Sequence, residues 1–141
     1  MQPHRTHPLR ILSVNDEEAP LKVVEIVITR YFKGVTVQSF QDAEEAWHEL
    51  SRADPDLLIS DDLMGKLNGD EIIGRLADRM VTYPIIVINA YGPERDQWVS
   101  DFAKQGVDVT MLRAPFDITT LRKVVAASLN VPPDKDREQK G

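Results

Sequence analysis

The sequence contains no cysteine, which excludes a disulfide framework and any site built on thiolates. It has no apolar run near the roughly 20 residues that cross a membrane. Its start, Met1 to Pro8, lacks the apolar stretch of a secretion signal. Basic residues are the minority, with 17 Lys and Arg against 23 Asp and Glu, and they are scattered along the chain. We therefore expect a soluble, cytoplasmic protein whose domain binds neither membrane nor nucleic acid.

What the chain does contain is enough apolar sequence for one core. Its 141 residues are 42% hydrophobic and 28% charged, which is the composition of an ordinary single domain. The polar ends predict a flexible tail at residues 1–8 and a polar tail or linker at residues 131–141. The folded domain is therefore expected over residues 9–130.

Short apolar runs alternate with segments of helical periodicity, a pattern typical of βαβ units around a parallel sheet. Asp42 and Asp117 are each placed to cap the helix that follows, and Asp42 forms a capping-box pattern with Glu45. The expected strands are Leu9 to Val14, Val35 to Phe40, Leu57 to Ser60, Ile85 to Ile88 and Val109 to Leu112. A helix is expected after each strand, which predicts an α/β fold.

Short polar side chains stand at the carboxyl ends of three of these strands. Asn15 and Asp16 follow the first strand, Asp61 and Asp62 the third, and Asn89 the fourth. Open α/β sheets bind ligands outside the carboxyl ends of their strands, so these groups are expected to converge on one crevice. Two carboxylates about 5 Å apart repel by roughly 3 kcal/mol at an effective dielectric of about 20. Such a pair favours a divalent cation with oxygen ligands, such as Mg²⁺.

Residues from about Leu9 to Leu129 resemble the receiver domain of two-component response regulators. The matching segments are Ile11-Leu12-Ser13-Val14-Asn15-Asp16-Glu17, Asp56-Leu57-Leu58-Ile59-Ser60-Asp61, Met64 to Gly69, Pro84-Ile85-Ile86-Val87-Ile88-Asn89-Ala90, Gly106 and Pro115-Phe116. The resemblance implies a flavodoxin-like, doubly wound (βα)5 fold whose five-stranded parallel sheet has the order 2-1-3-4-5. It also implies a bacterial signalling phosphoprotein.

In this family a phosphoryl group passes to an aspartate from the phosphohistidine of a sensor histidine kinase or a phosphotransfer protein. By resemblance, Asp61 is the phosphoacceptor. Mg²⁺ would be held by Asp16, Asp61, the backbone carbonyl of Leu63 and, through water, Asn15. The domain is then not an enzyme, although it assists its own phosphorylation and dephosphorylation. It would signal to an unknown output domain or protein through its fourth helix, fifth strand and fifth helix.

Several positions depart from the family pattern. Asn15 stands where a second acid is usual, so the pocket is expected to hold Mg²⁺ more loosely. Asn89 replaces the usual Ser or Thr with an amide that can still donate to a phosphoryl oxygen. Ala114 stands where the family places a Lys, and Arg113 is the candidate to replace that Lys beside the phosphoryl group.

Two other positions bear on the lifetime of the phosphoryl group and on its signal. Leu63 and Tyr91 stand where the family flanks the path of the attacking water, and their bulk predicts slow hydrolysis. The family's switch aromatic falls at Thr110 or Met111, so the usual coupling from Thr to an aromatic side chain is expected to be absent.

Ordinary structural explanations remain for several of these residues. Asp16, Glu17 and Glu18 would favour a helix N-terminus without any metal. Arg113 fits equally well as a surface charge. Asp62 points opposite to Asp61 along the strand, and we expect it to be solvated.

Two other functions are open to this sequence. The changes at Asn15, Asn89 and Ala114 are consistent with a degenerate receiver that docks proteins without being phosphorylated. A flavin-binding electron carrier has the same fold, but the acidic run Asp16-Glu17-Glu18 would repel a flavin phosphate after the first strand.

Overall fold

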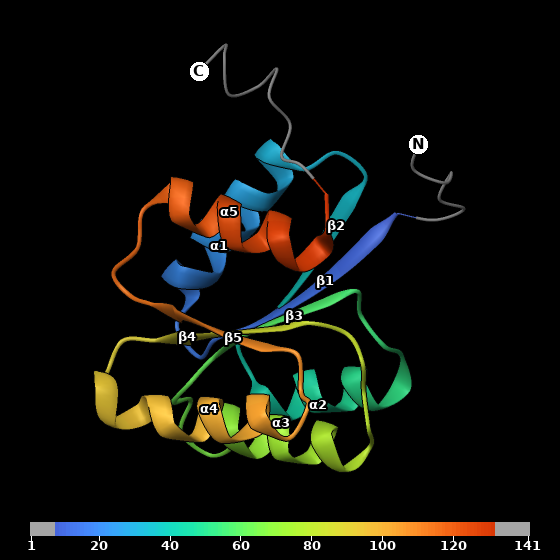
Figure 1. Ribbon diagram of the computed structural model, residues 1–141. Coiled ribbons are helices and arrows are strands. Elements are labelled where there is room, and N and C mark those ends of the chain that lie inside the picture. Colours follow the sequence, from blue (N-terminus) through green and yellow to red (C-terminus); the bar gives the residue numbers. More distant parts are fainter. Residues whose placement is uncertain (1–7, 132–141) are drawn as a thin grey trace.

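The computed structural model describes residues 8–131 and shows the α/β architecture expected from the sequence (Figure 1). Five parallel strands form one sheet in the order β2-β1-β3-β4-β5. The strands are β1 (Leu9–Val14), β2 (Val35–Phe40), β3 (Leu57–Asp61), β4 (Ile85–Asn89) and β5 (Val109–Arg113). The helices are α1 (Glu18–Tyr31), α2 (Ala43–Arg52), α3 (Gly69–Asp78), α4 (Asp96–Lys104) and α5 (Ile118–Leu129), with a 3-10 turn η1 (Pro93–Arg95) before α4.

Helices cover both faces of the sheet. Helices α1 and α5 lie on one face and α2, α3 and α4 on the other (Figure 1). Successive side chains of a strand point to opposite faces, so the neighbours Ile11 and Leu12 of β1 belong to different core clusters although both are fully buried. This double cover explains why β3 and β4 are apolar without alternation.

Helix ends follow the expected signals with small differences. Asp117 caps α5 by accepting a hydrogen bond from the N–H of Thr120 at 2.7 Å. Asp42 caps α2, and its carboxylate accepts from the N–H of Glu44 at 2.8 Å. Strands β3 and β4 each continue one residue beyond the predicted end, so that Asp61 and Asn89 belong to the sheet itself.

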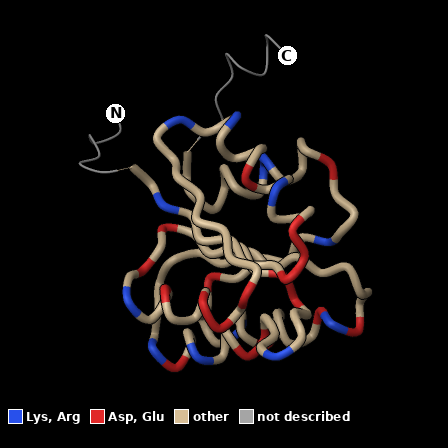
Figure 2. Tube along the Cα trace, turned by 180° about the vertical axis from the view of Figure 1, so that it is seen from behind, with Lys and Arg blue, Asp and Glu red and all other residues tan. Residues whose placement is uncertain are grey.

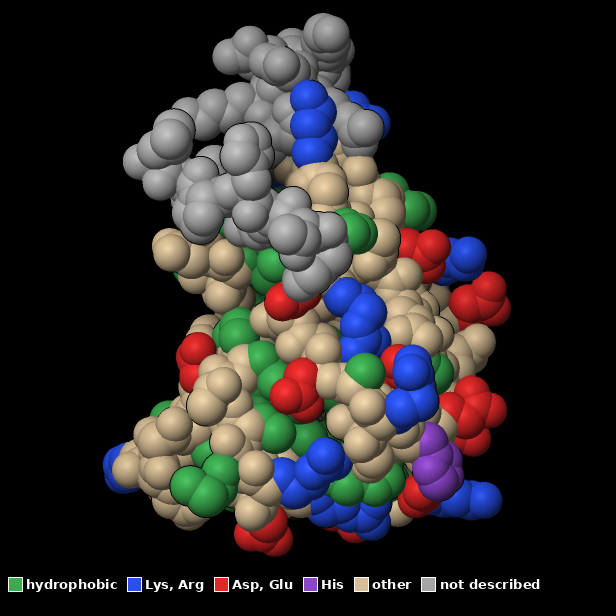
Figure 3. Space-filling view, turned by 90° about the vertical axis from the view of Figure 1, so that its right-hand side faces the viewer, with side chains coloured by type: hydrophobic (Ala, Val, Ile, Leu, Met, Phe, Trp, Pro, Cys, Tyr) green, Lys and Arg blue, Asp and Glu red, His purple; other side chains and the backbone are tan. Residues whose placement is uncertain are grey.

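Charged residues lie on the helices and loops around the sheet (Figure 2), and both signs are interspersed on the face shown in Figure 3. Among residues 8–131, no helix combines the length and the apolar character needed to cross a membrane. The tails predicted at residues 1–8 and 131–141 fall almost entirely outside the described residues.

Candidate functional site

Of the polar residues singled out at the strand ends, Asn15 and Asp61 line one cavity at the edge of the sheet, and Asp16, Asp62 and Asn89 do not line it. Strand β3 lies between β1 and β4, with Val14 beside Ser60 and Asp61 beside Ile88. A cavity of about 370 Å³ opens at this edge. It is lined by Asn15, Glu17, Pro20, Val23, Val24, Asp61, Ile88, Ala90, Tyr91, Ala114, Pro115 and Phe116. The side chains of Asn15 and Asp61 therefore share one opening, most of whose wall is apolar.

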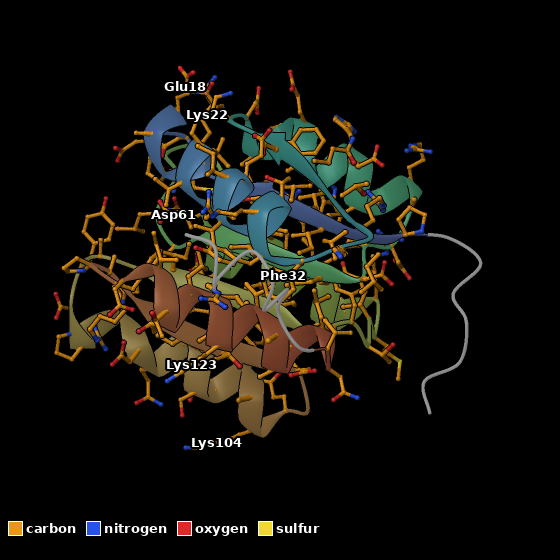
Figure 4. The ribbon with its side chains drawn as sticks, turned by 90° about the horizontal axis from the view of Figure 1, so that it is seen from above. Glu18, Lys22, Phe32, Asp61, Lys104 and Lys123 are labelled. Atoms are coloured by element: carbon orange, nitrogen blue, oxygen red, sulfur yellow. The ribbon has the colours of Figure 1, made fainter. Side chains whose placement is uncertain are left out.

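The Asp61 carboxyl group is the most perturbed acid of the site. Its side chain is buried, with 9% of the residue exposed, and its pKa rises from 3.8 to about 6. Burial is the main cause of the raised pKa, and the negative charge of Asp16 is the second. In Figure 4, Asp61 lies at one end of the sheet. Glu18 and Lys22, in the first turns of α1, project near the same end. A buried carboxylate with acidic neighbours is a site that gains from a bound cation.

Asn15 and Asp16 approach Asp61 in different ways. Asn15 is buried, and its side-chain oxygen accepts a hydrogen bond from the N–H of Glu17 at 2.9 Å, which shapes the turn from β1 into α1. Asp16 is exposed, and its charge still acts on Asp61. The turn built by Asn15 thus keeps Asp16 close enough for its charge to act on Asp61, although Asp16 does not line the cavity.

Asn89 is fully buried, and its amide organises the loop after β4. Its nitrogen donates to the carbonyl of Gly92 at 3.0 Å and to the Asp96 carboxylate at 3.3 Å. Its oxygen accepts from the N–H of Tyr91 at 2.7 Å. In this conformation the nitrogen and the oxygen of the amide both form hydrogen bonds that stabilise the connection from β4 to α4.

Arg113 points toward α4. Its guanidinium group forms an exposed ion pair with the Asp96 carboxylate and is not part of the cavity wall. Ala114, the residue at the family's Lys position, lines the cavity instead. None of the described residues that line the cavity is basic.

The expectation that Asp62 is solvated was wrong. Asp62 is fully buried, and its carboxylate accepts two hydrogen bonds from Arg95, from Nε at 2.9 Å and from Nη2 at 2.8 Å. It also accepts one from Trp98 Nε1 at 3.2 Å. The face opposite to Asp61 is covered by helices rather than by water, so the alternation of the strand buries Asp62 too. Arg95 was the sequence signal that was missed, since a buried acid needs a cationic partner.

The loop after Asp61 is closed by a hydrogen bond from the N–H of Gly69 to the carbonyl of Asp62, at 2.7 Å. A Cβ at Gly69 would lie 2.7 Å from the carbonyl oxygen of Asp61, so a side chain does not fit there. The loop between them carries Leu63, which is half-buried, and Met64, whose N–H donates to the Asn68 side chain at 2.6 Å. Glycine at position 69 therefore keeps this loop tight against the strand end.

The donor groups fit a hard cation better than a soft one. Among the described residues, no three His, Cys, Asp or Glu side chains are grouped closely enough to hold a metal by themselves. Asp16 and Asp61 supply carboxylates, and the loop after Asp61 supplies backbone carbonyls. Mg²⁺ accepts such a set because it prefers oxygen ligands and retains several waters.

Comparison with known proteins places this geometry in context. A model of the response regulator receiver domain matches residues 11–126. The chain is 31% identical over 88 residues to the alkaline phosphatase synthesis transcriptional regulatory protein PhoP of Bacillus subtilis, covering 62% of this chain and 36% of that protein. It is 30% identical over 129 residues to the regulator of RpoS of Escherichia coli, covering 88% of this chain and 36% of that protein.

Among solved structures, the chemotaxis protein CheY4 of Vibrio cholerae superimposes with a TM-score of 0.71 and 25% identity, covering 86% of this chain and 99% of that one. The chain thus spans about a third of the length of the two curated relatives, 36% in each case, and nearly all of the solved chain.

Proposed function

Because the chain belongs to the response regulator receiver domain family, we propose that Asp61 accepts a phosphoryl group from a phosphohistidine in a Mg²⁺-dependent reaction. The observation that carries this proposal is the Asp61 carboxyl group, which is buried at the mouth of the cavity with a pKa raised to about 6. An acid kept in this environment is poorly explained as a surface charge and well explained as a reacting group.

The reaction assigned to Asp61 is a nucleophilic substitution at phosphorus. One carboxylate oxygen forms a bond to phosphorus, the N–P bond of the phosphohistidine breaks, and the electron pair returns to the imidazole nitrogen, which takes up a proton. Asp16, Asp61, the Leu63 carbonyl and, through water, Asn15 would hold Mg²⁺. When bound, the metal neutralises charge on the carboxylates and the phosphoryl oxygens.

Other residues complete the proposal. For Asn89 or Arg113 to reach a phosphoryl oxygen, each must leave its present partners in the loop and on α4. Tyr91 lines the cavity, and Leu63, which does not line it, follows the acceptor by two residues. In this proposal both side chains restrict water and prolong the life of the aspartyl phosphate. In this proposal the domain is a phosphoacceptor that assists its own reactions rather than an enzyme with a separate substrate.

The proposal extends to partners and location. The donor is a sensor histidine kinase or a phosphotransfer protein. The output leaves through the α4, β5 and α5 face to a domain or protein that the chain itself does not identify. The relatives named as regulators in bacteria support a bacterial, cytoplasmic two-component protein.

The test is to incubate the protein with Mg²⁺ and phosphoramidate and to measure the intact mass. The wild type should gain the mass of one phosphoryl group, and Asp61→Asn should gain none. The gain should also disappear when EDTA removes the metal. A wild type that gains no mass would favour the docking alternative. An equal gain in Asp61→Asn would show that another residue accepts the phosphoryl group.

A further inference from the structure

A buried polar cluster joins the residue after the acceptor to the beginning of α4. The Asp62 carboxylate accepts hydrogen bonds from Arg95 at 2.8 and 2.9 Å and from Trp98 at 3.2 Å. Arg95 ends the 3-10 turn and Trp98 lies in the first turn of α4. The two-point contact fixes the guanidinium group in direction as well as in distance.

Asp62 is held firmly to the acceptor strand. Its N–H donates to the carbonyl of Ile88 at 3.0 Å, and its carbonyl accepts from Gly69 at 2.7 Å. With its side chain fully buried, Asp62 has no room to reorient independently of Asp61. A displacement of the Asp61 backbone is therefore passed to the Asp62 carboxylate and to the Arg95 and Trp98 groups bound there.

The family resemblance implies a coupling from a Thr near the pocket to an aromatic side chain on β5, and this chain lacks both residue types at those positions. Strand β5 carries Thr110, which is exposed, and Met111 where an aromatic side chain would be needed. The Asn89 amide is bonded within its own loop. The Asp62 cluster provides a direct connection from the acceptor to α4 that needs neither an aromatic nor a hydroxyl group.

We propose that the cluster of Asp62, Arg95 and Trp98 couples the occupancy of Asp61 to the position and stability of α4. This inference rests on the phosphoacceptor role of Asp61. Occupancy holds the backbone of Asp61 in one position, and the Asp62 carboxylate, which moves with that backbone, then stays bonded to Arg95 and Trp98 for more of the time. The start of α4 therefore opens less often. Arg95 and Trp98 are thus positioning residues for the output helix.

The experiment measures amide hydrogen exchange of residues 93–104 with and without beryllofluoride and Mg²⁺, while fluorine NMR reports the bound beryllofluoride. In the wild type, occupancy should slow the exchange of this segment by about fivefold or more, the lower end of common coupling between sites. In the double variant Asp62→Leu/Arg95→Met, the fluorine signal should persist while exchange in 93–104 no longer responds. A response of wild-type size in this double variant overturns the inference.

Gln97→Met is the matched control, because it breaks an exposed hydrogen bond to Asp101 within the same helix and leaves the buried cluster intact. The control variant should keep the full change in hydrogen exchange. Loss of that change in the control would overturn the special role of the cluster. If circular dichroism shows that the double variant is unfolded, Arg95→Lys replaces it, since Lys keeps the charge without the two-point contact. A response of at most half supports the inference in that variant, and a full response overturns it.

The failure of the two proposals can be told apart. A wild type without bound beryllofluoride and without phosphoryl mass gain overturns the function of Asp61 and this inference together. A wild type that binds beryllofluoride while exchange in 93–104 stays constant overturns the coupling alone.

Discussion

At the scale of the residue, the buried Asp61 carboxyl group has a cost in stability that its proposed phosphoacceptor role explains. Its pKa is raised to about 6, first by burial and then by the charge of Asp16. In the unfolded chain the same group titrates near its ordinary value, so the folded state binds the proton more tightly. The stabilisation from protonated Asp61 is complete below about pH 4 and is lost as the pH rises through about 6.

Asp61→Asn should therefore stabilise the protein at pH 7.5 in the absence of metal. A shift of about two pKa units corresponds to about 3 kcal/mol, and partial access of water reduces the expected gain to about 1 to 2 kcal/mol. The gain should shrink toward zero at pH 4, where the wild-type carboxyl group is protonated. Urea unfolding in EDTA at both pH values measures it. Asp108→Asn, at an exposed position, is the control, and an equal gain in that variant would show that the stabilisation does not come from the burial of Asp61.

Leu63 and Tyr91 allow a second prediction at this scale. Tyr91 lines the cavity, with 51% of the residue exposed, and Leu63 is half-buried. Leu63→Asn should speed the loss of the phosphoryl group by about tenfold, because a polar side chain there can orient the attacking water. Decay of the phosphorylated mass after removal of the donor measures this rate. Ile26→Asn, an exposed change outside the cavity, should leave it unchanged, and equal rates in all three proteins would refute the protective role.

At the scale of the element, the loop that joins β3 to α3 depends on Gly69. Helix α3 begins at this glycine, and its N–H closes the loop on the carbonyl of Asp62. An added Cβ would meet backbone, which cannot move aside as a flexible side chain can. The residue therefore links the start of a helix to the geometry of the acceptor.

Gly69→Ala should lower the free energy of unfolding by about 1 to 3 kcal/mol, the usual cost of overpacking, and slow phosphorylation of Asp61. Gly74→Ala is its matched control in the same helix. A Cβ at Gly74 would meet only a Phe102 side-chain atom at 3.7 Å, an ordinary contact, so the gain in helix propensity should leave this variant as stable as the wild type or up to about 1 kcal/mol more stable. Urea unfolding compares the two, and equal losses would contradict the steric argument.

Two ion pairs of different kinds hold the segment of η1 and α4 near the strand ends. The pair of Arg95 with Asp62 ends on a fully buried carboxylate, whereas Arg113 and Asp96 meet at the surface. Removing one partner of a buried pair leaves a charge without compensation, while exposed pairs contribute little.

Arg95→Met should therefore lower the free energy of unfolding by about 3 kcal/mol, since only Trp98 would remain on the Asp62 side chain. Arg113→Met should cost less than about 1 kcal/mol. Thermal and urea unfolding at pH 7 in the same buffer distinguish them. Similar losses in the two variants would show that burial does not determine how much the Arg95–Asp62 pair contributes to stability.

At the scale of the whole molecule, the doubly wound sheet places three strand ends side by side. Strands β1, β3 and β4 are neighbours in space although α1, β2, α2 and α3 separate them in the chain. A cation held between the end of β1 and the end of β3 would connect distant parts of the fold and bind the native state only.

Mg²⁺ should therefore stabilise the whole domain. At ten times its dissociation constant, a ligand that binds only the native state adds about 1.4 kcal/mol. The midpoint of thermal unfolding should rise with Mg²⁺ concentration in the wild type and stay constant in Asp61→Asn. Equal rises in both proteins would place the stabilising cation away from Asp61.

Much of this protein could be predicted from the sequence by itself. Local signals decide this part, since apolar runs, capping residues such as Asp117 and the placement of Asp61 at the end of a buried strand all act over a few neighbours in the chain. The alternation of strands and helices then allows few topologies, and the parallel order of five strands was among them.

The tertiary structure decided which partner each polar group takes. Asp62 is buried against Arg95, 33 positions away, and Arg113 turns to Asp96, 17 positions away. Hydrogen bonds and ion pairs depend on distances of a few ångströms between side chains, and chain neighbours do not set those distances. Packing of η1 and α4 against the end of β3 set those distances here. For this reason Asp62, which the sequence predicts to be solvated, is buried and connects the end of β3 to the start of α4.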